Sequence, residues 1–200
     1  YLRPTSAALI FDDGEILCKG PNVMKGYFNK AKETEEAIDA EGWFYTGDIG
    51  KLDSEGFLKI TDRKKSIIVT SGGKNIAPAP LENTILNSIY VEQCIVVGDK
   101  KNFISCLIVP NFESLADFLN KEQLDLSSNQ AIIDHKSVLN LFDKIIDVSM
   151  KDFSQFEKVK EYRLLPNLWT LEKEELTPSL KNVRKKIQEN YGDIIDEMYL

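Results

Sequence analysis

The turn at Thr46-Gly47-Asp48 places a short carboxylate where glycine allows the backbone to bend tightly. A carboxylate in such a place can accept two hydrogen bonds from a vicinal diol such as a ribose. Charge-assisted bonds of this kind are about twice as strong as neutral ones. Considered alone, Asp48 has a simpler interpretation as a turn-capping aspartate, because aspartate side chains commonly bond to turn backbone.

Arg63 follows Asp48 by one expected hairpin. Two adjacent strands can bring Asp48 and Arg63 to the same sheet edge. Arginine offers a planar fork of donors that suits ribose oxygens or phosphate. The alternative is a solvated charge beside Asp62.

The segment Ser71-Gly72-Gly73 ends an expected strand, and glycines let a narrow ligand approach the backbone closely. A plain turn is the alternative. The phosphate-binding pattern GxxxxGK[ST] is excluded, because Asn75 stands after Lys74 where that pattern requires Ser or Thr.

Lys181 follows Thr177-Pro178-Ser179-Leu180 and precedes a basic, amphipathic segment. A lysine on a loop before a helix can reach a phosphate or a carboxylate. A surface lysine in water is the alternative, since lysine commonly extends its ammonium group into solvent.

The first sixty residues, which must position Asp48, are expected to be rich in β-structure. Asp13-Gly14 predicts a two-residue hairpin turn with positive φ at both positions, flanked by strands 7–12 and 15–19. Residues 30–40 form an expected acidic helix, which ends at Gly42. A second turn at 53–55 joins segments 50–52 and 56–61. Together these elements predict a small twisted sheet or part of a barrel.

After Arg63 the pattern changes to mixed helices and strands. A strand is expected over 66–70, followed by a helix from Pro78 with apolar residues every fourth position. Segments 92–97 and 104–109 are unbroken apolar runs, which predicts strands buried on both faces. Residues 162–170 are expected to be extended. The expected apolar positions of the three helices are Leu81, Ile85 and Ile89; Val138, Phe142, Ile145 and Ile146; and Val183, Ile187, Tyr191 and Ile195.

The fold class predicted from these patterns is α+β, with a boundary near 62–65. Residues 1–62 would be a β-rich piece. Residues 63–200 would be an α+β domain with a central sheet and flanking helices, of about 135 residues and therefore of ordinary domain size.

Composition excludes several function classes. The 200 residues are 42% hydrophobic and 28% charged, as in a globular chain with a core, and the net charge of −7 argues against general nucleic-acid binding. No run approaches the roughly 18 apolar residues of a membrane span. The sequence begins with Tyr1 and shows no signal peptide, which predicts a processed or excised piece of a protein that is not secreted.

The cysteines and the histidine do not form a reactive site. Cys94 and Cys106 lie in apolar runs and are expected to be buried, and Cys18 has no paired spacing with them. Reduced cysteines indicate the cytoplasm. His135 is the sole histidine, is expected to cap or flank a helix, and has no GxSxG-like turn to accompany it.

Taken together, the motifs resemble the last motifs of the AMP-forming adenylating enzymes. The segments that carry the resemblance are Tyr45-Thr46-Gly47-Asp48, Asp62-Arg63-Lys64-Lys65, Ser71-Gly72-Gly73, Ile76-Ala77-Pro78, Leu81-Glu82 and Leu176-Thr177-Pro178-Ser179-Leu180-Lys181. Further likeness lies in Gly14-Glu15-Ile16, Gly20-Pro21 and Met24-Lys25-Gly26-Tyr27. The Thr-Pro-Ser-Leu-Lys form is similar to long-chain fatty acyl-CoA synthetases. The resemblance covers the whole chain, but only the C-terminal third of such an enzyme.

The resemblance implies a reaction and a role for each candidate residue. An acid and ATP give an acyl-adenylate and pyrophosphate, and CoA then gives the thioester and AMP. Asp48 would hold the ribose hydroxyls with help from Arg63, and Lys181 would reach the α-phosphate and the acyl carboxylate. Lys65 would be the hinge of a mobile C-terminal domain. Ser71, Gly72 and Gly73 would line a CoA tunnel.

Some features depart from the family pattern. Leu180 stands where many relatives have glycine, and Lys65 stands where relatives are often acidic. The chain lacks the family's phosphate loop, its Mg²⁺-binding glutamate motif and its acyl pocket. We therefore expect this chain alone to be inactive, with the Mg²⁺ ligand elsewhere. Peripheral membrane contact stays open, as do two alternatives: a non-catalytic module that binds CoA, a nucleotide or a partner, and a ligase for another carboxylic acid.

Overall fold

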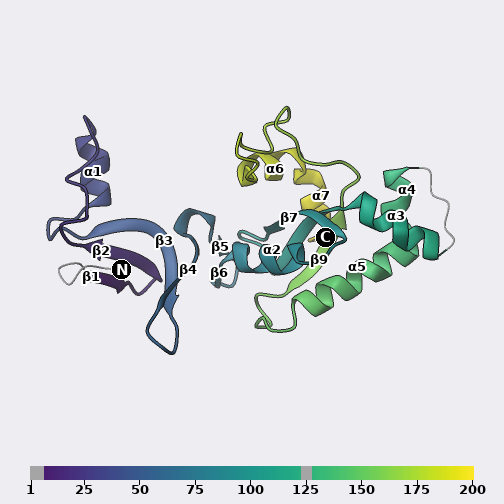
Figure 1. Cartoon of the computed structure of the whole chain (residues 1–200), viewed down its shortest axis with the longest axis horizontal. Coiled ribbons are helices and arrows are strands. Elements are labelled where there is room, and N and C mark those ends of the chain that lie inside the picture. Colours follow the sequence, from purple (N-terminus) through teal and green to yellow (C-terminus); the bar gives the residue numbers. More distant parts are fainter. Residues whose placement is uncertain (1–6, 123–127) are drawn as a thin grey trace. The chain divides into compact units, whose positions relative to one another are not determined.

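The computed structural model describes residues 7–122 and 128–200. The chain divides into two compact units, Tyr1–Ile67 and Ile68–Leu200 (Figure 1). The first is a β-sheet with one short helix, and the second is a mixed sheet between helices. This arrangement confirms the predicted α+β class.

The first unit is an antiparallel sheet with strand order β1-β2-β3-β4. Its elements are β1 (Ala7–Ile10), β2 (Glu15–Lys19), α1 (Ala31–Ala37), β3 (Phe44–Leu52) and β4 (Leu58–Arg63). Helix α1 is shorter than the expected 30–40, because Ile38 is already extended and forms a bridge with Phe44.

The first hairpin corrects the expected turn type. Ile10 pairs with Ile16, and the N–H of Gly14 bonds to the carbonyl of Phe11, so the connection is longer than two residues. Of Asp13 and Gly14, Gly14 alone has a positive φ, +87°. The Asp13 side chain accepts the N–H of Glu15 at 3.0 Å, which favours the longer turn.

The core of the first unit is small. Ile16 and Leu17 are the buried apolar side chains among its described residues. Large apolar side chains on and beside β3 and β4 are exposed, including Leu52, Phe57 and Ile60, each at least 60% accessible. A sheet of this kind buries little apolar surface by itself.

The second unit begins with short elements that differ from the expected strand 66–70. A 3₁₀ turn, η1 (Lys64–Ser66), lies near the end of the first unit, and the strand that follows has just two residues, 68 and 69. The following elements are β5 (Ile68–Val69), β6 (Asn75–Ile76) and α2 (Pro78–Leu86). Leu81 and Ile85 of α2 are buried as expected, but Ile89 lies beyond the helix end and is 70% exposed.

The central sheet of the second unit has the order β7-β8-β9. Strand β7 (Val91–Val97) pairs antiparallel with β8 (Ile104–Pro110), which pairs parallel with β9 (Val159–Leu164). Alternate residues of β7 and β8 enter two separate hydrophobic clusters, so both faces are buried as predicted. Strand β9 ends at Leu164, so of the expected extended segment 162–170 only residues 162–164 lie in a strand.

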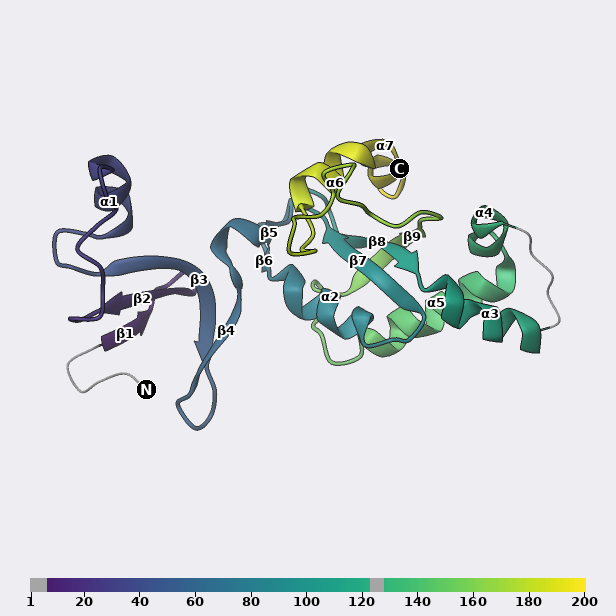
Figure 2. The same ribbon diagram turned by 45° about the horizontal axis from the view of Figure 1, so that its top comes forward.

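Helices cover both faces of this sheet (Figure 2). Helices α2, α3 (Phe112–Lys121), α4 (Asn129–Ile133) and α5 (Lys136–Ser149) pack on one face, whose core includes Val138, Phe142 and Ile146. Helices α6 (Arg184–Asn190) and α7 (Gly192–Glu197) pack on the other with Trp169. The expected single final helix is thus broken, since Tyr191 leaves the helical region at φ −115° and ψ 23°.

The predicted helix cap at His135 and the predicted burial of two cysteines are confirmed. His135 is the N-cap of α5, where its Nδ1 accepts the N–H of Ser137 at 3.2 Å. Cys94 and Cys106 are buried and free, and the hydrogen bond between them, together with burial, raises the pKa of the Cys94 thiol. Within the described residues, no helix is both long and apolar enough to cross a membrane.

Candidate functional site

Asp48 and Arg63 meet as predicted. They are direct partners across the β3–β4 ladder, and an Asp48 carboxylate oxygen lies 2.9 Å from Nη1 of Arg63. The Arg63 side chain is 67% exposed and that of Asp48 is 28% exposed. The pair therefore offers both an acceptor and a donor to a ligand that has hydroxyl or phosphate oxygens.

The backbone around Asp48 bulges out of the sheet. Glu15 pairs with Ile49 and Leu17 with Tyr45, so three residues of β3, Thr46 to Asp48, lie opposite the single residue Ile16. Bulges of this kind redirect side chains and are common beside functional sites. Gly47 supplies the positive φ of +71° that this bend needs.

Side chains replace the missing ladder bonds of the bulge. The Thr46 hydroxyl donates to the carbonyl of Ile16 at 2.6 Å and accepts the N–H of Asp48 at 3.1 Å. The N–H of Gly47 donates to Oε1 of Glu15 at 2.9 Å. Arg63 also donates to the carbonyl of Thr46, at 3.3 Å. The Asp48 carboxylate is thus carried on a bend with several hydrogen bonds.

A buried glutamate lies beneath this bend. The side chain of Glu15 is 5% exposed, and its Oε2 lies 2.7 Å from Nζ of Lys64. The same ammonium lies 2.7 Å from a carboxylate oxygen of Asp13. Hydrogen bonds to Asp13 and Glu15 raise the pKa of Lys64, and the bond from Lys64 lowers the pKa of Asp13.

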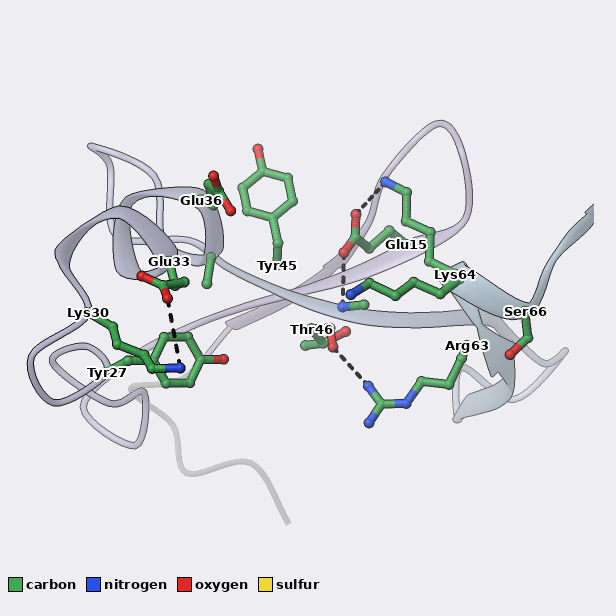
Figure 3. Close-up of a pocket in the computed structure, with 13 residues that line it drawn as sticks. Glu15, Tyr27, Lys30, Glu33, Glu36, Tyr45, Thr46, Arg63, Lys64 and Ser66 are labelled. Carbon is green, nitrogen blue, oxygen red and sulfur yellow. Dashed lines mark hydrogen bonds and ion pairs between the residues drawn. The ribbon is translucent and has the colours of Figure 1, made fainter. Parts of the chain in front are cut away.

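Glu15, Arg63 and Lys64 border an open cleft of about 880 Å³ in the first unit, whereas Asp48 is not among its lining residues (Figure 3). Its lining combines residues of α1 and the preceding loop with residues from β2, β3, β4 and η1. The charged lining residues are Glu15, Lys30, Glu33, Glu36, Arg63, Lys64 and Lys65. Lys65 lies in η1 and is exposed, next to the Lys64 that Glu15 binds. The mixed charges suit a polar, partly anionic ligand better than an apolar one.

Ser71, Gly72 and Gly73 lie in the loop between β5 and β6 of the second unit. Gly73 has φ +73° and open space where a Cβ would stand. The loop is attached to the β7–β8 turn: the N–H of Ser71 bonds to the carbonyl of Lys101 at 2.9 Å, and its hydroxyl to Asn102 at 2.8 Å. Asp99 accepts the N–H of Val69 at 3.1 Å.

Lys181 lies on an exposed turn before α6. The N–H of Lys181 donates to the Thr177 hydroxyl at 3.1 Å, and its carbonyl accepts the N–H of Thr177 at 2.8 Å. Leu180 takes the left-handed conformation, φ +59°. Within residues 7–122 and 128–200, no ion pair involves Lys181.

The chain after Lys181 is anchored to the sheet. Asn182 donates to the carbonyl of Cys94 at 3.2 Å, and Arg184 donates to the carbonyl of Val96 at 2.6 Å. Arg184 also binds Glu82 of α2 at 2.7 Å, and Glu82 accepts the N–H of Val96 at 2.7 Å. The base of the Lys181 turn is therefore fixed by partly buried polar contacts.

Residues 65–200 match the family profile described as "AMP-binding enzyme C-terminal domain". The chain belongs to the AMP-binding enzymes. This agrees with the family to which the sequence motifs point, and the profile match includes Lys65, the glycine loop and Lys181.

The chain is similar in sequence to proteins named as long-chain-fatty-acid–CoA ligases. Long-chain-fatty-acid–CoA ligase FadD15 of Mycobacterium tuberculosis is 38% identical over 200 residues, which cover 98% of this chain and 33% of the relative. Long-chain-fatty-acid–CoA ligase 6 of Mus musculus is 35% identical over 94% of this chain and 27% of the relative. The chain thus spans about a third of the length of the curated relatives it matches.

A solved structure shows the same fold. The adenylation domain of carboxylic acid reductase from Segniliparus rugosus, in complex with AMP and a carboxylic acid, aligns with a TM-score of 0.74 over 93% of this chain and 28% of that one, at 22% identity.

Two residues of this AMP-binding enzyme escaped the sequence-based site assignment. Glu15 and Lys64 lie in the motif segments named above, yet the sequence motifs assign no role to either residue. The one signal is that Glu15 directly precedes the apolar run Ile16-Leu17-Cys18, where a carboxylate needs a partner. Within the described residues, no group of three or more His, Cys, Asp or Glu side chains is arranged to hold a metal ion.

Proposed function

We propose that the chain is the C-terminal portion of an AMP-forming ligase that converts long-chain fatty acids to acyl-CoA. The observation that carries this proposal is the match to the long-chain-fatty-acid–CoA ligase FadD15, which is 38% identical over 98% of the chain. In the first step, a carboxylate oxygen would attack the α-phosphorus of ATP and pyrophosphate would leave. In the second, the CoA sulfur would attack the acyl carbonyl carbon and AMP would leave.

Asp48 and Arg63 are proposed to bind the ribose of ATP and AMP. Asp48 would accept hydrogen bonds from the two ribose hydroxyls, and Arg63 would hold the carboxylate in place and donate to a ligand oxygen. Their 2.9 Å pair on neighbouring strands supports this proposal, because both groups are fixed and reachable.

Lys181 is proposed to be the catalytic cation of the first step. Its exposed turn is fixed at its base by Asn182 and Arg184, while its side chain has no ion pair within the described residues. An ammonium at the α-phosphate would stabilise negative charge that develops as the new bond forms. Losing one such donor typically costs about 3 kcal/mol in the barrier.

The remaining roles concern motion and CoA. We propose that residues 1–62 end the large adenylating domain, that 63–200 form the mobile C-terminal domain, and that the hinge is near 62–65 at Lys65. Ser71, Gly72 and Gly73 would line the path of the CoA pantetheine arm, since Gly73 leaves open space at its α-carbon. A domain that presents two faces in turn can serve two steps with residues on separate loops.

The proposed ligands of the whole enzyme are ATP, CoA and a fatty acid, with Mg²⁺ held by residues outside this chain. The solved O-succinylbenzoate–CoA synthetase from Bacillus subtilis was captured with ATP and magnesium; it is 26% identical over 92% of this chain, with a TM-score of 0.62. The free, buried Cys94 and Cys106 support a cytoplasmic location.

The test is fatty-acid-dependent ATP–pyrophosphate exchange and acyl-CoA formation. The full-length protein that contains this chain should perform both with long-chain acids. The 200-residue chain alone should show no exchange, and measurable exchange by it would contradict the portion assignment. A full-length protein that adenylates short or aromatic acids but no long-chain acid would overturn the substrate assignment.

A further inference from the structure

Glu15 and Lys64 connect the two sides of the Asp48–Arg63 pair. Glu15 lies on β2, its Oε1 accepts the N–H of Gly47, which precedes Asp48, and its Oε2 binds Lys64, which follows Arg63. Figure 3 shows one carboxylate oxygen of Glu15 directed toward Lys64.

The bulge at Thr46 to Asp48 gives the Glu15 carboxylate a backbone N–H to bind. Three residues of β3 oppose one residue of β2 there, so the regular ladder cannot bond their backbone groups. The Glu15 carboxylate accepts the Gly47 N–H in place of a strand carbonyl. A Cβ on Gly47 would stand 3.8 Å from Nη1 of Arg63, so the bend lies against the guanidinium as well.

The structure assigns Glu15 and Lys64 as positioning residues that hold the Asp48 bulge and the Arg63 side of the nucleotide site in register. This inference rests on the proposed function, because it concerns the same ribose site. It adds two residues whose role is to orient the Asp48 carboxylate.

The charge balance explains why neither partner can be removed alone. Glu15 is buried, and a buried carboxylate that loses its cation is strongly destabilising unless the surroundings rearrange. Lys64→Met leaves that carboxylate with the Gly47 N–H but without the ammonium 2.7 Å away. Glu15→Gln keeps an oxygen for Gly47 and needs no cation. Asp13, the other partner of Lys64, is 40% exposed, so water can solvate its carboxylate, and the double variant leaves no buried charge unpaired.

The experiment measures AMP affinity by calorimetry in the full-length protein. Lys64→Met should weaken AMP binding about tenfold, as expected for a lost charge-assisted hydrogen bond. The Glu15→Gln/Lys64→Met double variant should return to within about threefold of the unmodified protein. Lys59→Met, at an exposed lysine of β4, the strand that precedes Lys64, is the matched control and should leave AMP affinity unchanged.

Kinetics separate positioning from general destabilisation. Lys64→Met should raise KM for ATP and leave KM for CoA unchanged, and equal changes in both would overturn the inference. A double variant as weak as Lys64→Met, or a Lys64→Met protein with the affinity of Lys59→Met, would also overturn it. Asp48→Ala separates the proposed ribose site from the proposed positioning role. If Asp48→Ala does not weaken AMP binding, the ribose assignment itself fails. If Asp48→Ala weakens AMP binding but Lys64→Met does not, the positioning role alone fails.

Discussion

The two units hold their candidate residues by opposite means. In the first unit, Asp48 and Arg63 are fixed by a strand ladder and by a buried carboxylate, but the sheet that carries them buries little apolar surface. In the second, the glycine loop and Lys181 lie on turns at the surface of a domain with two hydrophobic clusters. The comparison shows that a well-fixed site and a stable core are separate properties.

The largest difference between the units should appear when they are separated. We expect residues 68–200 to fold cooperatively alone, because both faces of their sheet are covered. Residues 7–67 should not, since Ile16 and Leu17 are their buried apolar side chains among the described residues. Circular dichroism during thermal denaturation checks both. A cooperative transition in the 7–67 fragment would contradict this comparison.

Lys181→Ala should have the largest effect on catalysis. In the full-length protein we expect adenylation to slow about 100-fold, because the lost cation stabilises charge developing at the α-phosphate. Thioester formation from preformed acyl-adenylate should change little. Single-turnover measurements of the two steps check this, with Lys185→Ala on α6 as the matched control. Equal loss in both steps would refute the role of Lys181.

Loosening the glycine loop should give a smaller effect, confined to the second step. Asp99→Ala removes the acceptor of the Val69 N–H, which we expect to cost about 1 kcal/mol of stability and to raise KM for CoA. Lys100→Ala in the same turn keeps the backbone bond to Val69 and serves as the control. Urea denaturation and initial-rate kinetics measure the two effects. An increase in KM for ATP rather than CoA would argue against the tunnel assignment.

The smallest effect should be a gain in stability on replacing Leu180 by glycine. Leu180 has φ +59°, a conformation that costs a side-chain-bearing residue about 1–2 kcal/mol and glycine much less. Leu180→Gly should therefore raise the free energy of unfolding by about 0.5–1 kcal/mol after the entropy cost of glycine. Leu168→Gly, at a half-exposed leucine, should lower it instead. Urea denaturation of the 200-residue chain compares the two, and a destabilised Leu180→Gly chain would contradict the argument.

The sequence predicts features that follow from local periodicity and turns. The turn near Asp53 predicts the β3–β4 hairpin, but Asp48 comes opposite Arg63 only after a register shift between Ile49 and Gly50. The unbroken apolar runs of β7 and β8 predict that both faces of these strands are buried. The family and the α+β class are confirmed, while the roles of Asp48, Arg63, Lys65, Lys181 and the glycine loop stay predictions.

What the sequence could not predict depends on contacts between distant residues. The partnership of Glu15 with Lys64 spans 49 positions and arises from a bulge whose extra residues leave no periodic signal. Expected strand 66–70 is shorter because Lys64 to Ser66 coil into a 3₁₀ turn despite the apolar residues that follow. The final helix breaks at Tyr191, although the apolar spacing continues to Ile195.

The anchor of the Lys181 turn has a further consequence for solubility. Strand β7 is an outer strand of its sheet, and such a strand can recruit a strand of another chain and start aggregation. Asn182, Arg184 and Glu82 occupy the carbonyl of Cys94 and both backbone groups of Val96 along that margin. The segment that presents the proposed catalytic lysine therefore also shields the sheet from self-association.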